Sequence, residues 1–353
     1  MSEHLSATGN LVQQLNDPAG LPHPILQTAM GKLYQGDCLL LLPKIPTGSI
    51  DLIFADPPFN LGKDYPSKIN DRRTEEEYLE WCRKWATECA RILKPGGSFF
   101  LFNLPRWNFA LGFHLRSMLT FRHLIAVEIS YRLPIQGRLY PSHYSLVYMC
   151  KGEKPTTFTP DRLPMETCRH CFGEVKDYGG YKDKMNPKGI NLSDVWHDIP
   201  PVRHAKFKRR NGSNELSIKL LDRVIRMASR EGDVVLDPFG GSGTTYVVAE
   251  IAGRKWVGME IGPIDGIAKR LSPGNVALER HFVDQIRSEL NHLFPPEVAA
   301  ARRAAEMWVP GDIPKGPPRK RSELKQELLL LEEPRIKSGY GSRPHGRMRG
   351  KRR

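Results

Sequence analysis

The stretch that most constrains the fold is DVVLDPFGGSGTT, residues 233–245. An apolar run typical of a buried strand leads into a turn with Gly240, Gly241 and Gly243, and a helix start follows. Such a helix start offers free N–H groups and a positive dipole end, so the order is typical of a nucleotide-type site in a doubly wound sheet. The turn lacks the G-x-G-x-x-G and P-loop patterns. Glycines that only pack a helix on a strand would look the same, so the turn alone does not decide its role.

Strand-like and helix-like segments alternate along most of the chain. Strands are predicted at SIDLIFAD (49–56), SFFLFN (98–103) and KWVGMEI (255–261). Thr74 followed by Glu77 has the capping-box spacing and predicts a helix that ends at KPGG, residues 94–97. The alternation predicts an α/β fold, with a doubly wound, mostly parallel sheet covered by helices on both faces. The pattern dissolves between residues 151 and 210, which predicts an irregular insertion.

Composition narrows the class of protein. The 353 residues carry a net charge of +14, which favours a polyanionic partner such as nucleic acid. No apolar run of about 18 residues occurs, so a membrane span is not expected. The N-terminus lacks the pattern of a signal peptide, and six scattered cysteines fit reduced thiols. Together these features predict a cytoplasmic protein.

The corner FADPPFN, residues 54–60, is the second feature that carries chemistry. Asp56 follows a predicted strand at the carboxyl edge, where open α/β sheets bind ligands. Pro57 and Pro58 lack N–H donors but keep their carbonyls, and Phe59 adds a flat apolar face. The corner therefore offers acceptors beside an aromatic ring, which fits a planar ligand with an amino group. A plain rigid turn is an equally good interpretation of these four residues taken alone.

Glu260 lies at the end of the predicted strand that follows the glycine turn. An acid at this place is positioned to accept hydrogen bonds from two ribose hydroxyls. A lone Glu at a strand end is usually a surface residue, so the pairing with the turn is what favours a binding role.

Taken together, these residues resemble the S-adenosylmethionine-dependent DNA amino-methyltransferases of the β arrangement. In that family a D/S-P-P-aromatic motif comes first, a target-recognition region follows, and an F-x-G-x-G motif comes last. Here the order is DPPF (56–59), residues 151–210, and FGGSG (239–243). The resemblance covers about residues 31–270. It implies a Rossmann-like methyltransferase fold with an inserted target-recognition region.

The resemblance also implies a division of the chain and a role for each motif residue. The expected parts are a flexible arm (1–30), a catalytic half (31–150), the target-recognition region (151–210), a cofactor-binding half (211–295) and a basic, partly disordered tail (296–353). The expected catalytic residues are Asp56, Pro57, Pro58 and Phe59, and those expected to bind S-adenosylmethionine are Asp37, Asp237, Phe239, Gly241, Gly243, Thr244 and Glu260.

The family uses Asp at the first motif position mostly for N6 of adenine and Ser mostly for N4 of cytosine. Asp56 therefore predicts a site-specific adenine methyltransferase, with N4-cytosine as the alternative. The chain departs from the family pattern at two places. Phe59 stands where Tyr is usual, and the helix before the glycine motif, which often begins with Thr-x-Lys-Pro, reads GSNELSIKLLDRVI (212–225) here. An RNA amino-methyltransferase and a DNA-binding protein without activity are the rival hypotheses.

The expected partner is double-stranded DNA, in the nucleoid of a bacterium, within a restriction-modification system or without one. A cognate restriction endonuclease and a second copy of the chain are candidate partners. CRHC, residues 168–171, is a weak zinc signal because a second ligand pair is absent, so no metal is predicted. The expected DNA contacts are Arg203, Lys206, Lys208, Arg209 and Arg210, although a charged loop is the usual meaning of such a run.

Overall fold

The computed structural model describes residues 21–62, 72–129, 136–137, 139, 141–167, 173, 175, 182–200 and 215–311. The chain forms two compact units, which we describe separately. The first contains residues 1–163 and 190–291, and the second contains residues 164–189 and 292–353. The predicted division at residues 31, 151, 211 and 296 follows function rather than compactness, and it stays a prediction.

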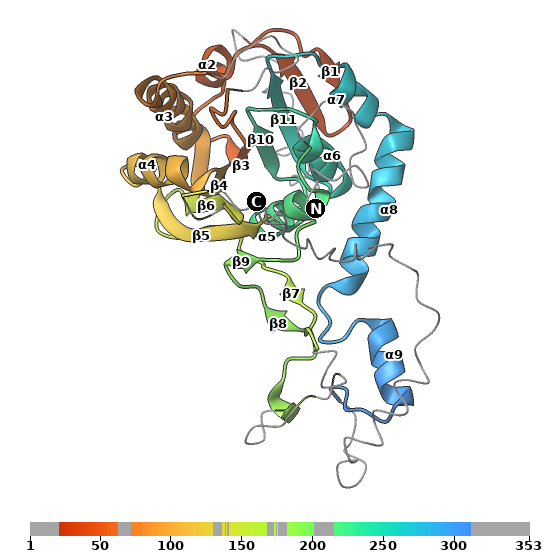
Figure 1. Ribbon diagram of the computed structural model, residues 1–353. Coiled ribbons are helices and arrows are strands. Elements are labelled where there is room, and N and C mark those ends of the chain that lie inside the picture. The colour runs from red at the N-terminus through yellow and green to blue at the C-terminus, as the bar shows by residue number, and fades with distance from the viewer. Residues whose placement is uncertain are drawn as a thin grey trace, which may run out of the picture. The chain divides into compact units, whose positions relative to one another are not determined.

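A nine-stranded sheet forms the first unit, in the order β1-β2-β11-β10-β3-β4-β6-β5-β9 (Figure 1). Strands β2, β11, β10, β3 and β4 run parallel to one another, whereas β1 pairs antiparallel with β2, and β6 pairs antiparallel with β4 and β5. The mostly parallel sheet confirms the prediction. The strands are β1 (Leu26–Gln27), β2 (Gly31–Gln35), β3 (Ile50–Ala55), β4 (Leu93–Asn103), β5 (Thr120–Glu128), β6 (His143–Cys150), β9 (Val195–Trp196), β10 (Val234–Asp237) and β11 (Lys255–Glu260).

Helices cover both faces of this sheet, because buried strands carry apolar side chains on both sides. On β3, Ile53 and Ala55 pack with α2, α3 and α4, whereas Leu52 and Phe54 pack with α5, α6 and α8. The fold is therefore a three-layer, doubly wound α/β domain. The helices of this unit are α2 (Cys38–Leu41), α3 (Glu75–Ile92), α4 (Pro105–Leu115), α5 (Ile218–Ala228), α6 (Thr244–Ile251), α7 (Asp265–Arg270) and α8 (Pro273–Glu289).

The start of α3 confirms the capping box. The Thr74 hydroxyl accepts the Glu77 N–H at 3.3 Å, and the Glu77 carboxylate accepts the Thr74 N–H at 2.9 Å. The helix ends at Ile92, two residues before Lys94 of KPGG, close to the predicted end, whereas β4 begins at Leu93 rather than at Ser98, so that KPGG is part of that strand. The chain is already a strand at KPGG because the Gly96 N–H donates to the carbonyl of Lys151 at 2.7 Å, and Lys151 directly follows β6.

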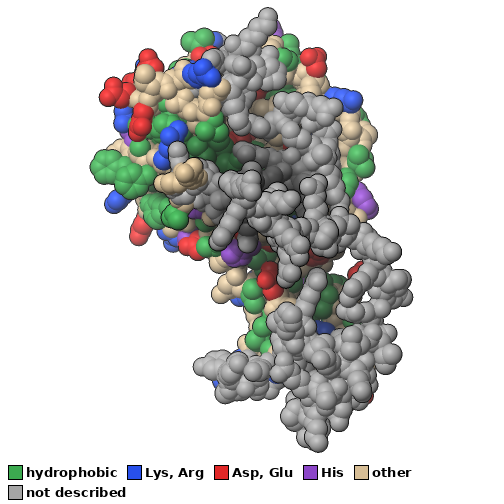
Figure 2. Space-filling view, in the orientation of Figure 1, with side chains coloured by type: hydrophobic (Ala, Val, Ile, Leu, Met, Phe, Trp, Pro, Cys, Tyr) green, Lys and Arg blue, Asp and Glu red, His purple; other side chains and the backbone are tan. Residues whose placement is uncertain are grey.

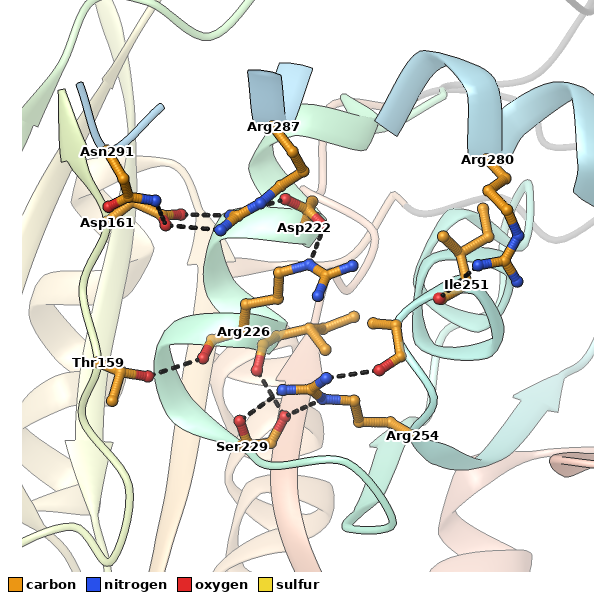
Figure 3. Close-up of polar contacts among 12 residues, drawn as sticks. Thr159, Asp161, Asp222, Arg226, Ser229, Ile251, Arg254, Arg280, Arg287 and Asn291 are labelled. Atoms are coloured by element: carbon orange, nitrogen blue, oxygen red, sulfur yellow. Dashed lines mark hydrogen bonds and ion pairs between the residues drawn. The ribbon is translucent and has the colours of Figure 1, made fainter. Parts of the chain in front are cut away.

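An ion-pair network fastens α8 to α5 and to the first residues of the irregular region (Figure 3). The Arg287 guanidinium on α8 donates to both carboxylate oxygens of Asp161, at 2.7 and 2.9 Å. It also donates to Asp222 of α5 at 3.3 Å, and Arg226 donates to the same carboxylate at 2.6 Å. Asp161 directly precedes β7 (Arg162–Leu163), which pairs with β8 (Ile190–Asn191). The chain is thus held on the first unit at both borders of residues 164–189.

The second unit has a small core of its own. Val175, Leu293, Phe294, Ala299 and Val309 are buried together, with α9 (Pro296–Ala304) supplying one side. A short helical turn, η3 (Lys182–Lys184), belongs to the same unit. Parts of the predicted recognition region and of the predicted tail therefore pack with each other. The segment RSELKQELLLLEE (321–333), whose sequence pattern predicts an amphipathic helix, and the motif CRHC lie outside the described residues.

The outer surface of α4 is unusually apolar. Phe109 and Phe113, one turn apart, are 88% and 80% exposed. Figure 2 shows hydrophobic side chains gathered at the left of the molecule, where α4 lies in Figure 1. Exposed aromatic pairs of this kind are typical of interaction surfaces. Among the described residues, no helix is long and apolar enough to cross a membrane.

Candidate active site

The sheet order brings the predicted site residues to one edge. The strands β2, β11, β10 and β3 are neighbours and parallel, so their carboxyl ends lie side by side. Asp37, Glu260, Asp237 and Asp56 stand at or just after these four ends, in that spatial order. Their order along the chain is different, because β10 and β11 follow β3 by some 180 residues but insert between β2 and β3. Open α/β sheets bind their ligands at such a crossover.

Asp237 shapes the glycine turn. One of its oxygens accepts the Phe239 N–H at 2.9 Å, and the other accepts the Thr245 hydroxyl at 2.5 Å. Burial raises the pKa of Asp237 to about 7. Gly241 and Gly243 have φ values of +52° and +75°, in the left-handed region that favours glycine. A Cβ at Gly241 would meet only the Phe239 carbonyl within 4 Å, at 3.8 Å, so the backbone there is open to a ligand.

Glu260 is tied to this turn. Its carboxylate accepts the Gly241 N–H at 2.7 Å and the Gly262 N–H at 2.6 Å. Burial raises the pKa of Glu260, and these N–H groups oppose that shift. The Gly36 N–H donates to the Glu260 carbonyl at 2.9 Å, so the turn that carries Asp37 lies beside it. Each carboxylate oxygen keeps a second lone pair for a ligand hydroxyl.

Asp37 and Thr244 also have partners inside the protein. The Asp37 carboxylate caps α2 by accepting the Leu39 N–H at 2.9 Å. The Thr244 hydroxyl accepts a hydrogen bond from Arg270 at 2.7 Å and is buried. Phe239 packs edge-on against Trp85, with ring centroids 5.0 Å apart. A contact of Thr244 with the cofactor stays a prediction.

The corner at Asp56 holds an acceptor without a donor. The Oδ1 atom of Asp56 is buried and has no hydrogen-bond partner within the residues that the structure describes. Burial and, after it, the charge of Asp237 raise the pKa of Asp56 well above its usual range. Among the described residues, no N–H or O–H donates to the Pro57 carbonyl. A buried acceptor of this kind is costly unless a ligand donor reaches it.

Three aromatic rings form one wall of the corner: Phe59 of the corner itself, Tyr144 of β6 and Phe102 of β4. The Phe59 ring lies 5.6 Å from the Tyr144 ring of β6 and 6.2 Å from the Phe102 ring of β4, measured between centroids. The ring therefore has a fixed orientation beside the free acceptors of Asp56 and Pro57.

Protein donors hold the rest of the corner, and these residues were missed by sequence reasoning. The Tyr78 hydroxyl on α3 donates to the Pro58 carbonyl at 2.7 Å, and the Trp107 indole on α4 donates to the Phe59 carbonyl at 2.9 Å. The Asn103 amide donates to the Tyr78 hydroxyl at 3.0 Å. In the sequence, Tyr78 and Trp107 occupy apolar positions of helices, so they look like ordinary core residues.

Asn60 was quoted in the sequence motif without a role of its own. Its φ of +54° is left-handed, and its side-chain amide exchanges two hydrogen bonds of 2.9 Å with the Arg73 backbone. These bonds join the two ends of the segment between the corner and α3. The predicted DNA contacts Arg203, Lys206, Lys208, Arg209 and Arg210 lie outside the described residues, as does CRHC.

Replacing Tyr78 by phenylalanine should slow methyl transfer about tenfold, because the Pro58 carbonyl loses its donor and the corner loses its position. The affinity for S-adenosylhomocysteine should stay within about twofold. Single-turnover rates and calorimetry measure the two quantities.

Tyr148→Phe is the matched control. This buried Tyr hydroxyl contacts Ser98 at 3.3 Å, away from the corner. Equal slowing in both variants would show that the loss of any buried tyrosine hydroxyl suffices, and would contradict a positioning role for Tyr78.

The fold and this site define a class: doubly wound α/β enzymes whose candidate site lies at the carboxyl ends of neighbouring parallel strands. The DNA methylase family model matches residues 50–265. The chain belongs to this family and is a DNA methyltransferase, which favours the DNA enzyme over the two rival hypotheses. The methyl donor of the family is S-adenosylmethionine.

Relatives agree with this assignment. The type II methyltransferase M.BamHI of Bacillus amyloliquefaciens is 52% identical over 82% of this chain and 68% of its own length. The DNA adenine methyltransferase YhdJ of Escherichia coli K12 is 34% identical over 65% of this chain and 78% of its own. Among solved structures, the cytosine-N4-specific PvuII DNA methyltransferase aligns with a TM-score of 0.49 and 23% identity, over 74% of this chain and 93% of that one.

Proposed function

We propose that this protein methylates the exocyclic amino group of a base flipped out of duplex DNA at a specific sequence, with N6 of adenine as the preferred target. One observation carries the proposal: the buried Asp56 Oδ1 lacks a donor, beside the Pro57 carbonyl and the Phe59 ring. Flipping is required because the target nitrogen is out of reach inside the base stack, and it costs a few kcal/mol.

The corner would act by gripping the amine. Asp56 and the Pro57 carbonyl each accept one hydrogen of the amino group, while Phe59 stacks on the base. This grip favours a pyramidal nitrogen and directs its lone pair away from the ring. The charge of Asp56 then stabilises the positive charge that grows on the nitrogen. Positioning and electrostatics, rather than a strong base, would supply the rate enhancement.

The neighbouring strand ends fit S-adenosylmethionine, which supplies an electrophilic methyl group when bound. Glu260 has free lone pairs for ribose hydroxyls, and Asp37 lies on the adjacent turn. The open backbone at Gly241 leaves room for the methionine part, next to Asp237, Phe239 and Gly243. These assignments come from the geometry of the turn together with the family resemblance.

Adenine and cytosine both present an amino group beside a ring nitrogen, so the acceptors of the corner fit either base. Asp56 favours adenine through the family's tendency, and YhdJ, the relative named an adenine methyltransferase, is 34% identical. Cytosine N4 is the second candidate, because the pairing of Asp with adenine in this family is a tendency and not a rule.

The test is single-molecule sequencing of genomic DNA from a methylation-free bacterium that expresses the full chain, with mass spectrometry of the nucleosides. We expect N6-methyladenine confined to one short motif. N4-methylcytosine would overturn the choice of base and keep the chemistry. Methylation at a ring carbon, or none with folded protein present, would contradict amino transfer. Cells that express Asp56→Ala are the matched control.

The remaining partners follow from the same proposal. A cognate restriction endonuclease fits the resemblance to a type II methyltransferase. A second copy of the chain is a further candidate, and the exposed Phe109 and Phe113 provide a surface for it. The substrate would place the protein at the bacterial chromosome, in the cytoplasm.

A further inference from the structure

A second buried carboxylate with a free oxygen lies near the glycine turn. Glu215 directly precedes the Leu216–Ser217 entry into α5, and its side chain is 5% exposed. Its Oε2 atom is buried and has no hydrogen-bond partner in the described part of the chain. The mechanism proposed above does not use it. An unpartnered buried carboxylate oxygen is costly, so its surroundings need an explanation.

Among the described residues, Glu215 pairs with Arg270, whose Nη1 atom lies 3.4 Å from Oε1. Arg270 is already neutralised by another acid. Its Nε and Nη2 atoms donate to the two oxygens of Glu279 at 2.7 and 2.8 Å, in a bidentate pair. Glu279 therefore already balances the charge of Arg270, and Glu215 adds a second negative charge beside it.

Arg270 also places Glu215 relative to the turn. The same Nη1 atom donates to the Thr244 hydroxyl at 2.7 Å and to the Ser242 carbonyl at 3.3 Å. One guanidinium nitrogen thus joins Glu215 to residues 242–244, where the turn passes into α6. This stretch contains Gly243 and directly follows Gly241, two of the residues that we assign to the methionine moiety of the cofactor.

We propose that Glu215 binds the α-ammonium group of S-adenosylmethionine through its free Oε2 atom. The ammonium group is the cationic N–H donor at that end of the cofactor, and it would satisfy both the unpaired oxygen and the surplus charge. The inference rests on the placement of the methionine moiety at the glycine turn, which is part of the proposed function.

The test compares two ligands on the full chain by calorimetry. S-adenosylhomocysteine carries the ammonium group, whereas 5′-methylthioadenosine shares the adenosine and sulfur but lacks the amino-acid end. Glu215→Gln should weaken S-adenosylhomocysteine about 10- to 100-fold, the usual effect of losing a hydrogen bond to a charged group, and methylthioadenosine less than twofold. Equal losses for both ligands, or none, would overturn the inference.

Glu279→Gln is the matched control, because it disturbs Arg270 without removing the free oxygen. If it produced the same ligand-selective loss, Glu215 would act only through Arg270, and the inference would fail. If Glu215→Gln does not fold, a binding experiment on the wild-type chain still tests the inference. An S-adenosylhomocysteine analogue that lacks only the amino group should bind about 10- to 100-fold more weakly, and equal binding would refute the assignment. A wild-type chain that bound neither ligand would instead contradict the proposed function.

Discussion

Replacing Asp56 by alanine should lower the rate constant of methyl transfer by about 10²- to 10³-fold. The variant loses both the acceptor that holds the amine and the charge that stabilises the nitrogen as it becomes positive. The affinity for S-adenosylhomocysteine should stay within about threefold, since the glycine turn and Glu260 are untouched. Single-turnover transfer to duplex DNA and calorimetry separate the two effects.

The pH dependence of the methyl-transfer rate tests the same role of Asp56. Burial and the nearby charge of Asp237 raise the pKa of Asp56, so the proton is retained to a higher pH than in an ordinary carboxyl group. A protonated Asp56 has lost its charge and one acceptor, so the rate should fall as the pH drops through this raised pKa. The residual activity of Asp56→Ala should lose this dependence.

Asp51→Ala is the matched control for Asp56. Asp51 lies on β3, the strand that leads to Asp56, but at its opposite end, where the Asp51 carboxylate pairs with the Lys94 ammonium group at 2.8 Å. This change should lower stability and leave the single-turnover rate of folded protein within about twofold. Wild-type transfer by Asp56→Ala, or an equal loss in both variants, would refute the mechanism.

Replacing Glu260 by alanine should weaken S-adenosylhomocysteine about 100-fold. The variant loses two hydrogen bonds to backbone N–H groups that shape the turn, as well as the predicted acceptor for the ribose, and each hydrogen bond to a charged group contributes about 1.5–3 kcal/mol. Methylthioadenosine should suffer equally, because it contains the same ribose. This distinguishes Glu260 from Glu215.

Asp265→Ala, a change of an exposed acid at the start of α7, should leave both affinities unchanged. Calorimetry on folded protein measures the affinity of each variant, Glu260→Ala and Asp265→Ala, for S-adenosylhomocysteine and for methylthioadenosine. Binding of both ligands within twofold of wild type in Glu260→Ala would contradict the ribose role.

Local features of the site could be predicted from the sequence because they depend on neighbours in the chain. The Thr74–Glu77 capping box, the strand before Asp56 and the strand that ends at Glu260 all form where expected. The doubly wound sheet follows from their alternation. The positive φ of Gly241 and Gly243 follows from the turn that glycine permits.

Contacts between distant segments needed the tertiary structure. Only the insertion of β10 and β11 between β2 and β3 brings Glu260 and the glycine turn to the edge that carries Asp56. The donors Tyr78 and Trp107 come from α3 and α4, and nothing in their local pattern separates them from the core. Residues 203–210, expected to contact DNA, lie outside the described residues, and their role stays a prediction.

By itself, the sequence determined the types of elements, the order of the motifs and the chemistry each motif offers, because strand, turn and helix patterns are local. The tertiary structure decided which carboxylate oxygens lack a partner among the described residues. Asp56 and Glu215 are ordinary carboxylates in the sequence, and each becomes a buried acceptor with a free oxygen only through packing. Burial and hydrogen-bond satisfaction depend on segments far apart in the chain, so local patterns do not predict them.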